Sequence, residues 1–310
     1  MSEYTSEDLK KLQTLSLEQK IRWAEKRIKW WYEAWKGQVY VSFSGGKDST
    51  VLLDIVRRMY PEVEAVFCDT GLEYPEIREF VKSKENVTWL RPEINFRQVI
   101  KQKGFPVVSK TVSHAVSVAK RNPDGAVRRN MFNPDKKGRF AMHSWEHLIY
   151  APFEVSDKCC DIMKKKPVHK FSRQSGKKAI VGTMACESSM RRTQWMKNGC
   201  NAFDTEYPTS HPLSIWTEQD ILAYIDTYKI PYASVYGEIN QNAKGEYFTS
   251  GESRTGCMFC MFGAHLEKKP NRFQRMKTTH PLQYDYCMRE EALGGLGLAK
   301  VLDYLGVDYE

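Results

Sequence analysis

The sequence predicts an α/β protein built on an open, mostly parallel sheet with helices on its faces. Short β-branched runs such as VYVSF and AVFC alternate with amphipathic segments of helix length. A glycine-containing turn follows the first of these runs directly. Alternation of buried strands and helices is the pattern of parallel sheets, whose ligands bind beyond the carboxyl ends of the strands. The turns that follow the strands are therefore where we expect function.

The first half of the chain predicts the elements of this sheet in order. Leu17–Trp35 has apolar and aromatic residues at helical spacing among many charges, and Gly37 ends it. Its tryptophans, Trp30, Trp31 and Trp35, are interpreted as packing residues. The elements expected next are a strand at Val39–Phe43, a helix at Ser49–Arg58, a strand at Ala65–Cys68, a helix at Tyr74–Lys82 and a strand at Val87–Leu90.

The second half is less regular. We expect an exposed insertion at Arg121–Arg139, a strand at Ala179–Gly182 and a loop at Glu187–Arg192. Thr217 and Asp220 have the spacing of a capping box at a helix start. Gly237–Gly256 is rich in turn residues, and a helix is expected within Glu291–Leu305. The predicted organisation is a helical segment at 1–36, an α/β domain at 37–235 and a C-terminal extension at 236–310.

Composition narrows the class of protein. The 310 residues include 41% hydrophobic residues, enough for a sizeable core. There is no apolar run of about 18 residues and the N-terminus is polar, so we expect a cytoplasmic protein without a membrane span. The net charge of +9 favours anionic ligands: ATP, a sulfonucleotide or nucleic acid. An ordinary basic surface explains the charge equally well, and a homodimer is a candidate assembly.

The most informative segment is VYVSFSGGKDST, residues 39–50. Gly45 and Gly46 let the backbone approach an anion closely, and Lys47 supplies a charge for phosphate oxygens. Ser49 or Thr50 is expected to cap the following helix, whose free N–H groups favour phosphate. The spacing is not that of a Walker A loop. The segment predicts a site for a nucleotide polyphosphate, with a simple glycine turn as the alternative.

Four motifs then occur in one order: SFSGGKDST, FCDTGLEYPE at 67–76, CCDIMKKKP at 159–167 and HPLSIWTEQDILAYI at 211–225. Together they resemble the phosphoadenosine phosphosulfate (PAPS) reductase family of the PP-loop ATP pyrophosphatase superfamily, over roughly residues 37–262. The resemblance implies an adenine-nucleotide α-hydrolase-like fold. ATP-cutting members keep SGGKDS complete, as this chain does, whereas the loop of sulfonucleotide reductases has drifted.

This resemblance assigns roles to the loop residues. Lys47 and Asp48 are the expected catalytic residues, and Asp48 is also a candidate ligand of Mg²⁺. The residues expected to hold the β and γ phosphates of ATP are Ser44, Gly45, Gly46, Lys47, Asp48 and Ser49. Asp69 and Thr70 are expected along the path of the nucleotide. Arg191 and Arg192, with Glu187 beside them, are expected near an anionic substrate or the α phosphate; a surface ion pair is the alternative.

The cysteines form a second constellation. Eight cysteines without an export signal argue against a disulfide framework. Cys257 and Cys260 have the spacing of two ligands of one metal centre, and with Cys159 and Cys160 they supply the four thiolates of a [4Fe–4S] cluster. The same tandem pair and CxxC occur in assimilatory adenylylsulfate reductases. Structural zinc and ordinary buried thiols are the alternatives.

The remaining reactive residues are interpreted more plainly. Cys186 is a candidate sulfur-carrying thiol, although a buried spectator is the favoured interpretation. The reductases carry a catalytic cysteine in a Glu-Cys-Gly motif near the C-terminus; this chain lacks that motif and has only Cys287 in its last 50 residues. The histidines His211, His265 and His280 are expected to be structural.

Three functions follow as hypotheses. The first is an enzyme that activates an oxygen with ATP, releases pyrophosphate and transfers sulfur with the help of an iron–sulfur cluster. Its sulfur donor and acceptor are not identified by the sequence. The second is a sulfonucleotide reductase that forms sulfite. The third is a non-catalytic sensor or partner subunit that binds ATP and the cluster.

Overall fold

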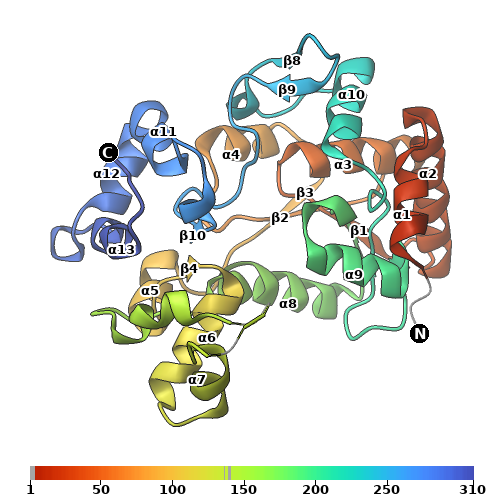
Figure 1. The fold of residues 1–310 in the computed structure, drawn as a ribbon. Coiled ribbons are helices and arrows are strands. Elements are labelled where there is room, and N and C mark those ends of the chain that lie inside the picture. The colour runs from red at the N-terminus through yellow and green to blue at the C-terminus, as the bar shows by residue number, and fades with distance from the viewer. Residues whose placement is uncertain (1–3, 136, 139–140) are drawn as a thin grey trace. The chain divides into compact units, whose positions relative to one another are not determined.

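The computed structural model describes residues 4–135, 137–138 and 141–310, and it divides into two compact units (Figure 1). The first unit comprises Met1–Asp69, Glu73–Arg91 and Pro167–Thr255. The second comprises Thr70–Leu72, Pro92–Lys166 and Gly256–Glu310. Each unit therefore collects segments from distant parts of the chain. The linear division at residues 36 and 235 expected from the sequence stays a prediction.

The first unit is built on a six-stranded sheet. Its strands lie in the order β3-β2-β1-β5-β7-β6, and all neighbours are parallel except β6 and β7. The strands of this unit, including the separate hairpin β8–β9, are β1 (Val39–Ser42), β2 (Ala65–Cys68), β3 (Val87–Leu90), β5 (Lys178–Val181), β6 (Asn201–Ala202), β7 (Thr209–Ser210), β8 (Ile239–Gln241) and β9 (Tyr247–Thr249). The predicted fold class, an open and mostly parallel sheet with flanking helices, is confirmed.

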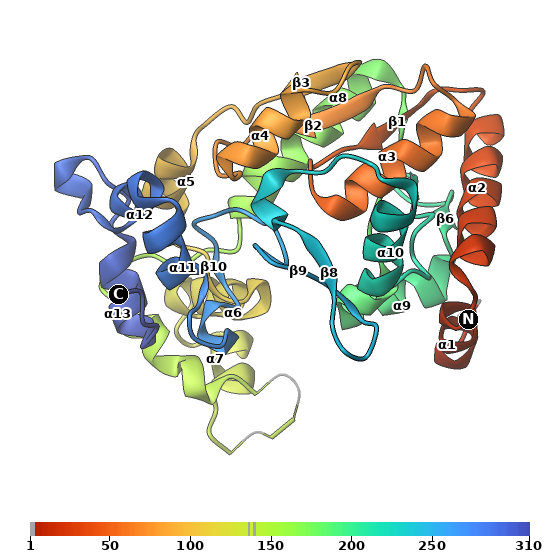
Figure 2. The same ribbon diagram turned by 90° about the horizontal axis from the view of Figure 1, so that it is seen from above.

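Helices cover both faces of this sheet (Figure 2). On one face, Val168 and Phe171 of α8 pack against Tyr40 and its buried neighbours from β2 and β5. On the other face, α3 packs against β1, α2 and α10. The helices of the unit are α1 (Ser6–Gln13), α2 (Leu17–Ala34), α3 (Lys47–Met59), α4 (Pro75–Lys82), α8 (Lys166–Ser175), α9 (Ser189–Asn198) and α10 (Glu218–Tyr228).

The order of the strands places the loop Ser44–Ser49, which the sequence predicts to bind a nucleotide. From β1 the chain runs to β2 on one side, whereas β5 pairs with β1 on the other. Such a reversal leaves a crevice beyond the carboxyl ends of the two central strands. Gly182, which follows β5, lies so close to the start of α3 that a Cβ atom there would be 3.1 Å from the carbonyl oxygen of Asp48. The ends of β1 and β5 thus converge on one site.

The second unit is mainly helical. Its short strands β4 (Val107–Val108) and β10 (Met261–Phe262) pair in parallel. Its helices are α5 (Phe96–Lys103), α6 (Lys110–Arg121), α7 (Ala126–Met131), α11 (Arg272–Thr279), α12 (Pro281–Met288) and α13 (Leu298–Leu305). Helical segments of other types are the 3₁₀ helices η1 (His143–Tyr150), η5 (Ala264–Leu266) and η6 (Glu291–Leu293) and the π-helix η2 (Asp161–Lys165). Val99, Val116 and Phe273 are fully buried in its core.

Several local predictions need correction. Glu187–Arg192 is not a loop, because Ser188 caps α9 with its side chain and the helix begins at Ser189. The turn-rich segment after Gly237 contains the hairpin β8–β9. The insertion at Arg121–Arg139 includes α7, none of whose residues is buried; positions 136, 139 and 140 lie outside the described residues. The packing role of Trp31 is confirmed by its full burial, whereas Trp30 is 51% exposed.

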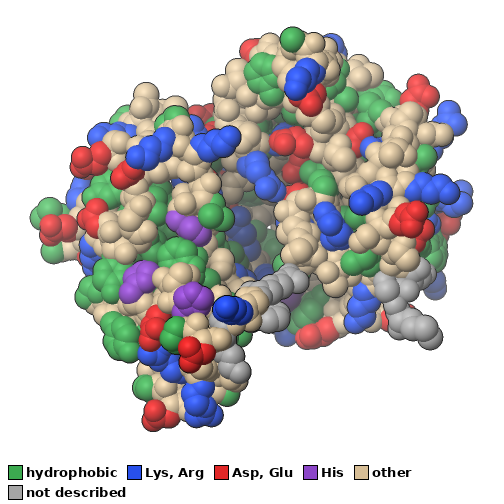
Figure 3. All heavy atoms as spheres, viewed as in Figure 1, with side chains coloured by type: hydrophobic (Ala, Val, Ile, Leu, Met, Phe, Trp, Pro, Cys, Tyr) green, Lys and Arg blue, Asp and Glu red, His purple; other side chains and the backbone are tan. Residues whose placement is uncertain are grey.

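Two general features bear on partners. Within the described part of the chain, no helix is both long enough and apolar enough to cross a bilayer. On the face seen in Figure 3, lysine and arginine side chains are interspersed with acidic ones. The positive side chains thus do not form one continuous basic surface on that face. A surface that binds nucleic acid has to be argued from particular residues.

Candidate functional site

The loop after β1 is closed by its own serines. The backbone N–H of Ser44 donates to Ser49 Oγ at 3.1 Å, and the two hydroxyl oxygens are 3.0 Å apart. Gly45 has φ of +73°, and a Cβ there would lie 2.7 Å from Val81 and 2.8 Å from Ile77. Only glycine fits this position without displacing α4. The loop is therefore a tight turn whose shape is fixed by packing beneath it.

The start of α3 differs from expectation. The helix begins at Lys47 with Gly46 as its N-cap and no capping side chain. Ser49 and Thr50 lie inside the first turn, where both hydroxyls donate to the carbonyl of Gly46. The prediction that either residue caps the helix is wrong, because the chain becomes helical before it reaches them. The helix N-terminus consequently opens at the loop itself, where N–H groups and the helix dipole favour an anion.

Lys47 is held beside the loop by residues that lie far from it in the sequence. Its ammonium group is 2.9 Å from Glu218 Oε1 and donates to the carbonyl of Ser253. Its backbone N–H donates to the Tyr236 hydroxyl at 3.2 Å, and that hydroxyl is 2.5 Å from Thr255 Oγ1. Burial raises the pKa of Tyr236 to about 12, so the phenol stays neutral. The donors of Lys47 are thus all met by oxygen atoms of the protein.

Asp48 is the unsatisfied group of the site. Its Oδ1 atom is buried and has no hydrogen-bond partner in the described part of the chain. Burial raises the pKa of Asp48 to about 6; the charge of Lys47 opposes this rise and that of Glu187 adds to it. A buried carboxylate oxygen without a partner is costly unless a cation or proton reaches it. The donor therefore fits a hard cation such as Mg²⁺.

Glu187 anchors two arginines beside this loop. Its side chain is 12% exposed, forms an ion pair with Arg191 and lies 2.9 Å from Arg254 Nη2. It also accepts the backbone N–H of Met184 at 2.8 Å. Arg192, in contrast, is exposed in the first turn of α9. Of the two predicted arginines, Arg191 is thus held near the loop by its ion pair with Glu187. This contact is the one that the ion-pair alternative predicts.

Asp69 and Thr70 have different surroundings. Asp69 is buried at the end of β2 and pairs with Arg78 at 3.0 Å and with Arg91 at 3.7 Å. Thr70 belongs to the second unit, where its hydroxyl accepts the N–H of Leu72 at 3.2 Å. The expected contact of these two residues with the nucleotide stays a prediction.

The four predicted cysteine ligands all belong to the second unit. Burial, and next the neighbouring thiols of Cys257, Cys160 and Cys260, raise the pKa of Cys159 well above its ordinary value. Burial likewise raises the pKa of Cys260, with a further contribution from Cys160. The structure thus brings the pair and the CxxC segment near one another. Among the described residues, however, no three His, Cys, Asp or Glu side chains stand as a ready-formed metal site.

Local structure explains how the two cysteine segments meet. Cys159 and Cys160 immediately precede the π-helix η2, a feature that is frequent at functional sites. Cys257 and Cys260 flank a turn in which Met258 N–H donates to the carbonyl of Leu72. The turn leads into β10, which pairs with β4. Arg272 donates to the carbonyl of Cys260 at 2.8 Å and so fixes the end of the CxxC segment.

Comparison with known proteins agrees with these features. The family model described as phosphoadenosine phosphosulfate reductase domain matches residues 38–123 and 89–261. These matches cover well over half of the chain, including the loop after β1, the cysteine pair and the CxxC segment. The chain belongs to the phosphoadenosine phosphosulfate reductase family.

Several proteins similar to this family member carry reductase names. An adenosine 5'-phosphosulfate reductase of Oceanobacillus iheyensis is 23% identical over 242 residues, which is 76% of this chain and 77% of that protein. One from Staphylococcus epidermidis is 21% identical over 253 residues, covering 78% and 85%. A crystal structure of the PAPS reductase from Candida auris, a phosphate complex, covers 76% of this chain and 95% of that one, with 15% identity and a TM-score of 0.41.

In this PAPS reductase family member, the other cysteines and histidines have distinct environments. Cys186 is exposed rather than buried as favoured from the sequence, yet partial burial raises the pKa of its thiol. Cys287 is fully buried, and burial raises its pKa to about 12. His211 is bonded through Nδ1 to Thr183 at 2.7 Å, whereas its Nε2 atom is buried and has no hydrogen-bond partner in the described part of the chain. Burial lowers the pKa of His211 to about 4.

The sequence alone did not identify the partners of Lys47. Glu218 follows the capping Thr217 within the WTEQD motif, so its position at a helix start was a usable signal. Tyr236, Ser253 and Thr255 lie in a turn-rich segment without periodicity, and no spacing rule links them to the loop.

Proposed function

We propose that this PAPS reductase family member is a PP-loop ATP pyrophosphatase that cleaves ATP to AMP and pyrophosphate and activates an acceptor by adenylation. The observation that carries the proposal is the loop Ser44–Ser49 at the start of α3. It combines a helix N-terminus, the ammonium group of Lys47 and the unpartnered carboxylate oxygen of Asp48. All three are needed for a triphosphate and none is needed by a plain glycine turn.

Phosphate binding would proceed by exchange of partners. Lys47 already donates to a carboxylate and a carbonyl, so phosphate oxygens would take the places of these protein oxygens. The backbone N–H of Lys47 would likewise exchange the Tyr236 hydroxyl for a phosphate oxygen as its acceptor. Exchange avoids exposing an unpaired buried ammonium group at any step. Arg191 and Arg254, held by Glu187, are near enough to add charge.

Magnesium fits the donors that are present. Asp48 offers one carboxylate oxygen without a partner, and Glu187 and Glu218 are close enough to influence its pKa. Mg²⁺ in nucleotide sites takes one or two carboxylates and completes its shell with phosphate oxygens and water. When bound, Mg²⁺ would neutralise negative charge on the leaving pyrophosphate. Asp48 would hold it, and Lys47 would neutralise the remaining charge.

The chemistry consists of two substitutions. An acceptor oxygen attacks the α phosphorus, the α–β phosphoanhydride bond breaks, and pyrophosphate leaves with the bonding electron pair. A sulfur nucleophile then attacks the activated carbon or phosphorus and AMP leaves with the oxygen. A donor at the oxidation level of sulfide needs no electrons for this exchange, whereas a persulfide donor needs two. The acceptor is a nucleobase, a nucleic-acid phosphate or a small metabolite.

We also propose that Cys159, Cys160, Cys257 and Cys260 hold a [4Fe–4S] cluster. The support is the donor set: four thiols gathered in one compact unit, two on a helix and two flanking a turn. Such a cluster would supply electron transfer or a site for sulfur when bound. Zinc is the alternative for four thiolates, and metal analysis separates the two.

A second candidate, a sulfonucleotide reductase, is favoured by the names of the relatives. A reductase of this kind needs a cysteine thiolate as the nucleophile. Burial raises the pKa of Cys287 to about 12, and that of exposed Cys186 is also raised. Neither environment favours the thiolate. We therefore rank adenylation first.

Product analysis distinguishes these functions. Anaerobically purified protein is incubated with Mg²⁺ and ATP in one reaction, and with adenylylsulfate and a thiol reductant in the other. AMP with pyrophosphate in the first reaction supports the pyrophosphatase. Sulfite in the second reaction, with no ATP cleavage, supports the reductase. ATP binding without turnover of either substrate indicates the sensor or partner subunit.

A further inference from the structure

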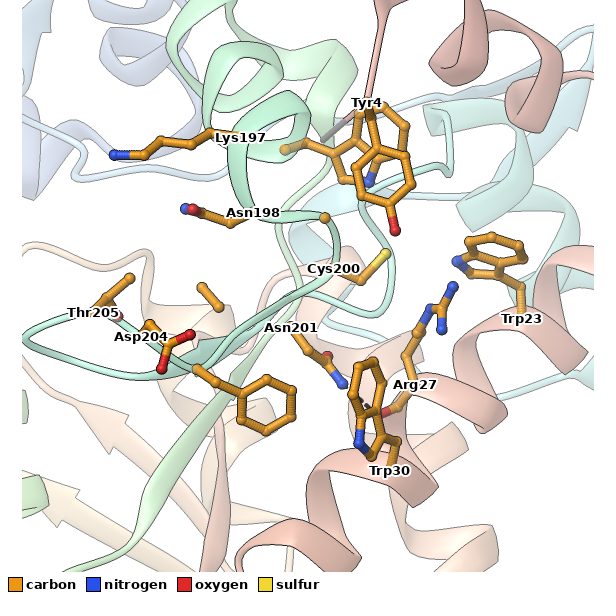
Figure 4. Close-up of a pocket in the computed structure, with 14 residues that line it drawn as sticks. Tyr4, Trp23, Arg27, Trp30, Lys197, Asn198, Cys200, Asn201, Asp204 and Thr205 are labelled. Atoms are coloured by element: carbon orange, nitrogen blue, oxygen red, sulfur yellow. Dashed lines mark hydrogen bonds between the residues drawn. The ribbon is translucent and has the colours of Figure 1, made fainter. Parts of the chain in front are cut away.

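A pocket that is separate from the loop Ser44–Ser49 lies in the first unit at the C-terminal end of α9 (Figure 4). It has a volume of about 280 Å³ and is formed by the N-terminal segment, α2 and residues 197–205. None of the residues of the nucleotide loop lines it. The family comparison and the proposed ATP chemistry assign no role to it.

Aromatic rings form the walls of this pocket. The rings of Tyr4 and Trp195 pack at a centroid distance of 4.9 Å, and those of Trp30 and Phe203 at 5.1 Å. Trp30 is 51% exposed although it is a large apolar side chain on a well-packed helix. An indole that is left half in solvent beside a pocket offers a free π face. Planar rings are the ligands that such walls accept.

Hydrogen-bond donors and positive charge complete the lining. The Arg27 guanidinium lies 4.3 Å from the centre of the Trp23 ring, and Figure 4 shows its side chain between the indoles of Trp23 and Trp30. Lys197 and Asn198 stand at the end of α9. Asp204 supplies an acceptor on the opposite side.

We propose that this pocket binds a nucleobase that carries phosphate, from either a free nucleotide or a single-stranded nucleic acid. The half-exposed indole of Trp30 stacks on the base, and the Asp204 carboxylate meets its polar edge. Arg27 meets the phosphate. Stacking on an aromatic platform beside basic side chains is the usual mode of single-strand recognition. The exposure of Trp30 distinguishes this pocket from a purely structural aromatic cluster, whose rings are buried.

The pocket is independent of the proposed ATP chemistry. α9 begins next to Glu187 beside the nucleotide loop and ends at Trp195–Asn198 in the pocket wall. One rigid helix therefore joins the two sites, but no side chain of the pocket contacts the phosphates in the mechanism above. Binding here can be measured without ATP and in the Lys47→Ala variant, so its failure is separate from failure of the proposed function.

The experiment uses two probes of known chemistry. A fluorescein-labelled oligothymidylate of about 12 nucleotides is titrated with the full chain and followed by fluorescence anisotropy. Uridine monophosphate is titrated into the Lys47→Ala variant by calorimetry. Trp30→Ala and Arg27→Gln test the pocket. Phe248→Ala, an exposed aromatic residue on β9, and Lys244→Gln, an exposed charge in the β8–β9 turn, are the matched controls.

We expect Trp30→Ala to weaken binding about tenfold, the effect of losing one base stack, and Arg27→Gln to weaken it through the loss of a phosphate contact, while both controls retain it. Arg27→Gln should also flatten the dependence of affinity on salt, because fewer counterions are released. If uridine monophosphate binds and the pocket variants weaken its binding, the ligand is a free nucleotide. If only the oligonucleotide binds in this way, the ligand is a single-stranded nucleic acid. Binding that is equal in wild type and both pocket variants, or lost equally in the controls, overturns the proposal. If Trp30→Ala unfolds, Arg27→Gln decides.

Discussion

Lys47 and Glu218 form an ion pair across the mouth of the nucleotide loop, with Nζ 2.9 Å from Oε1. The two side chains differ sharply in environment: that of Lys47 is 6% exposed, whereas that of Glu218 is 51% exposed. The lysine is therefore enclosed by the fold, whereas the carboxylate lies at the surface. In the proposed function, a phosphate that enters the loop replaces this carboxylate.

Glu218→Gln should increase the affinity for pyrophosphate by about two- to fivefold in the absence of metal. The substitution removes a competing negative charge, and half-exposed ion pairs of this kind contribute at most about 1 kcal/mol. Calorimetry with EDTA present measures the effect. Glu246→Gln, in the exposed hairpin turn, is the control for lost charge. Weaker binding by Glu218→Gln would contradict the interpretation of Glu218 as a competitor of phosphate.

Lys47→Ala should lower the rate of AMP formation from ATP by roughly two to three orders of magnitude. That is the scale for removing one group that stabilises charge in the transition state. Separation of AMP, ADP and pyrophosphate by chromatography measures it, and Lys229→Gln serves as a surface control. If the wild-type protein makes ADP instead of AMP, cleavage occurs at the β–γ bond and the PP-loop mechanism is wrong.

The sequence predicted those parts of the fold where local pattern and tertiary environment agree. β2 and β3 begin and end at the predicted residues, because each is a β-branched or aromatic run that packs in the sheet. The capping box at Thr217 and Asp220 is confirmed, since its hydrogen bonds depend only on residues three apart. The fold class followed from these short-range signals together with the rules of parallel sheets.

Other features lacked a local signal. α9 has one buried residue, Trp195, so its polar sequence shows no helical periodicity, and the loop predicted at Glu187–Arg192 overlaps its first turn. The contacts of Lys47 with Tyr236 and Ser253 join residues that are close only after folding. The orphan oxygen of Asp48 is a property of burial, which spacing does not encode. The pocket around Trp30 was missed because an aromatic stripe on a helix indicates core packing by default.

Acidification should destabilise the protein through His211. Burial, together with the nearby charge of Arg191, lowers the pKa of His211 to about 4, below the value of about 6.5 in an unfolded chain. Between these two values the unfolded state binds more protons than the folded one. The stability is therefore complete above about pH 6.5 and falls as the pH drops toward 4, by roughly 1–3 kcal/mol.

His211→Asn should remove most of this pH dependence, because asparagine can bond to Thr183 but does not titrate. Urea unfolding at several pH values between about 7 and 4 gives the free energy of unfolding for each variant. The difference between wild type and variant isolates His211 from other titrating groups. His143→Asn, which alters an exposed imidazole, should follow the wild type. Identical slopes for wild type and His211→Asn would refute the assignment.

Anaerobically isolated protein should be brown and contain about four irons per chain. Serine at any one of Cys159, Cys160, Cys257 or Cys260 should lower the iron content and bleach the visible absorbance, because each lost thiolate exposes one iron. Cys186→Ser and Cys200→Ser are matched controls that should keep both signals. The cluster would also tie the CxxC turn to η2, so its loss should increase proteolysis within the second unit. Stoichiometric zinc without iron, after anaerobic purification from iron-replete cells, would replace the cluster with a structural zinc site. Retention of full iron in all four ligand variants would show that these cysteines do not bind it.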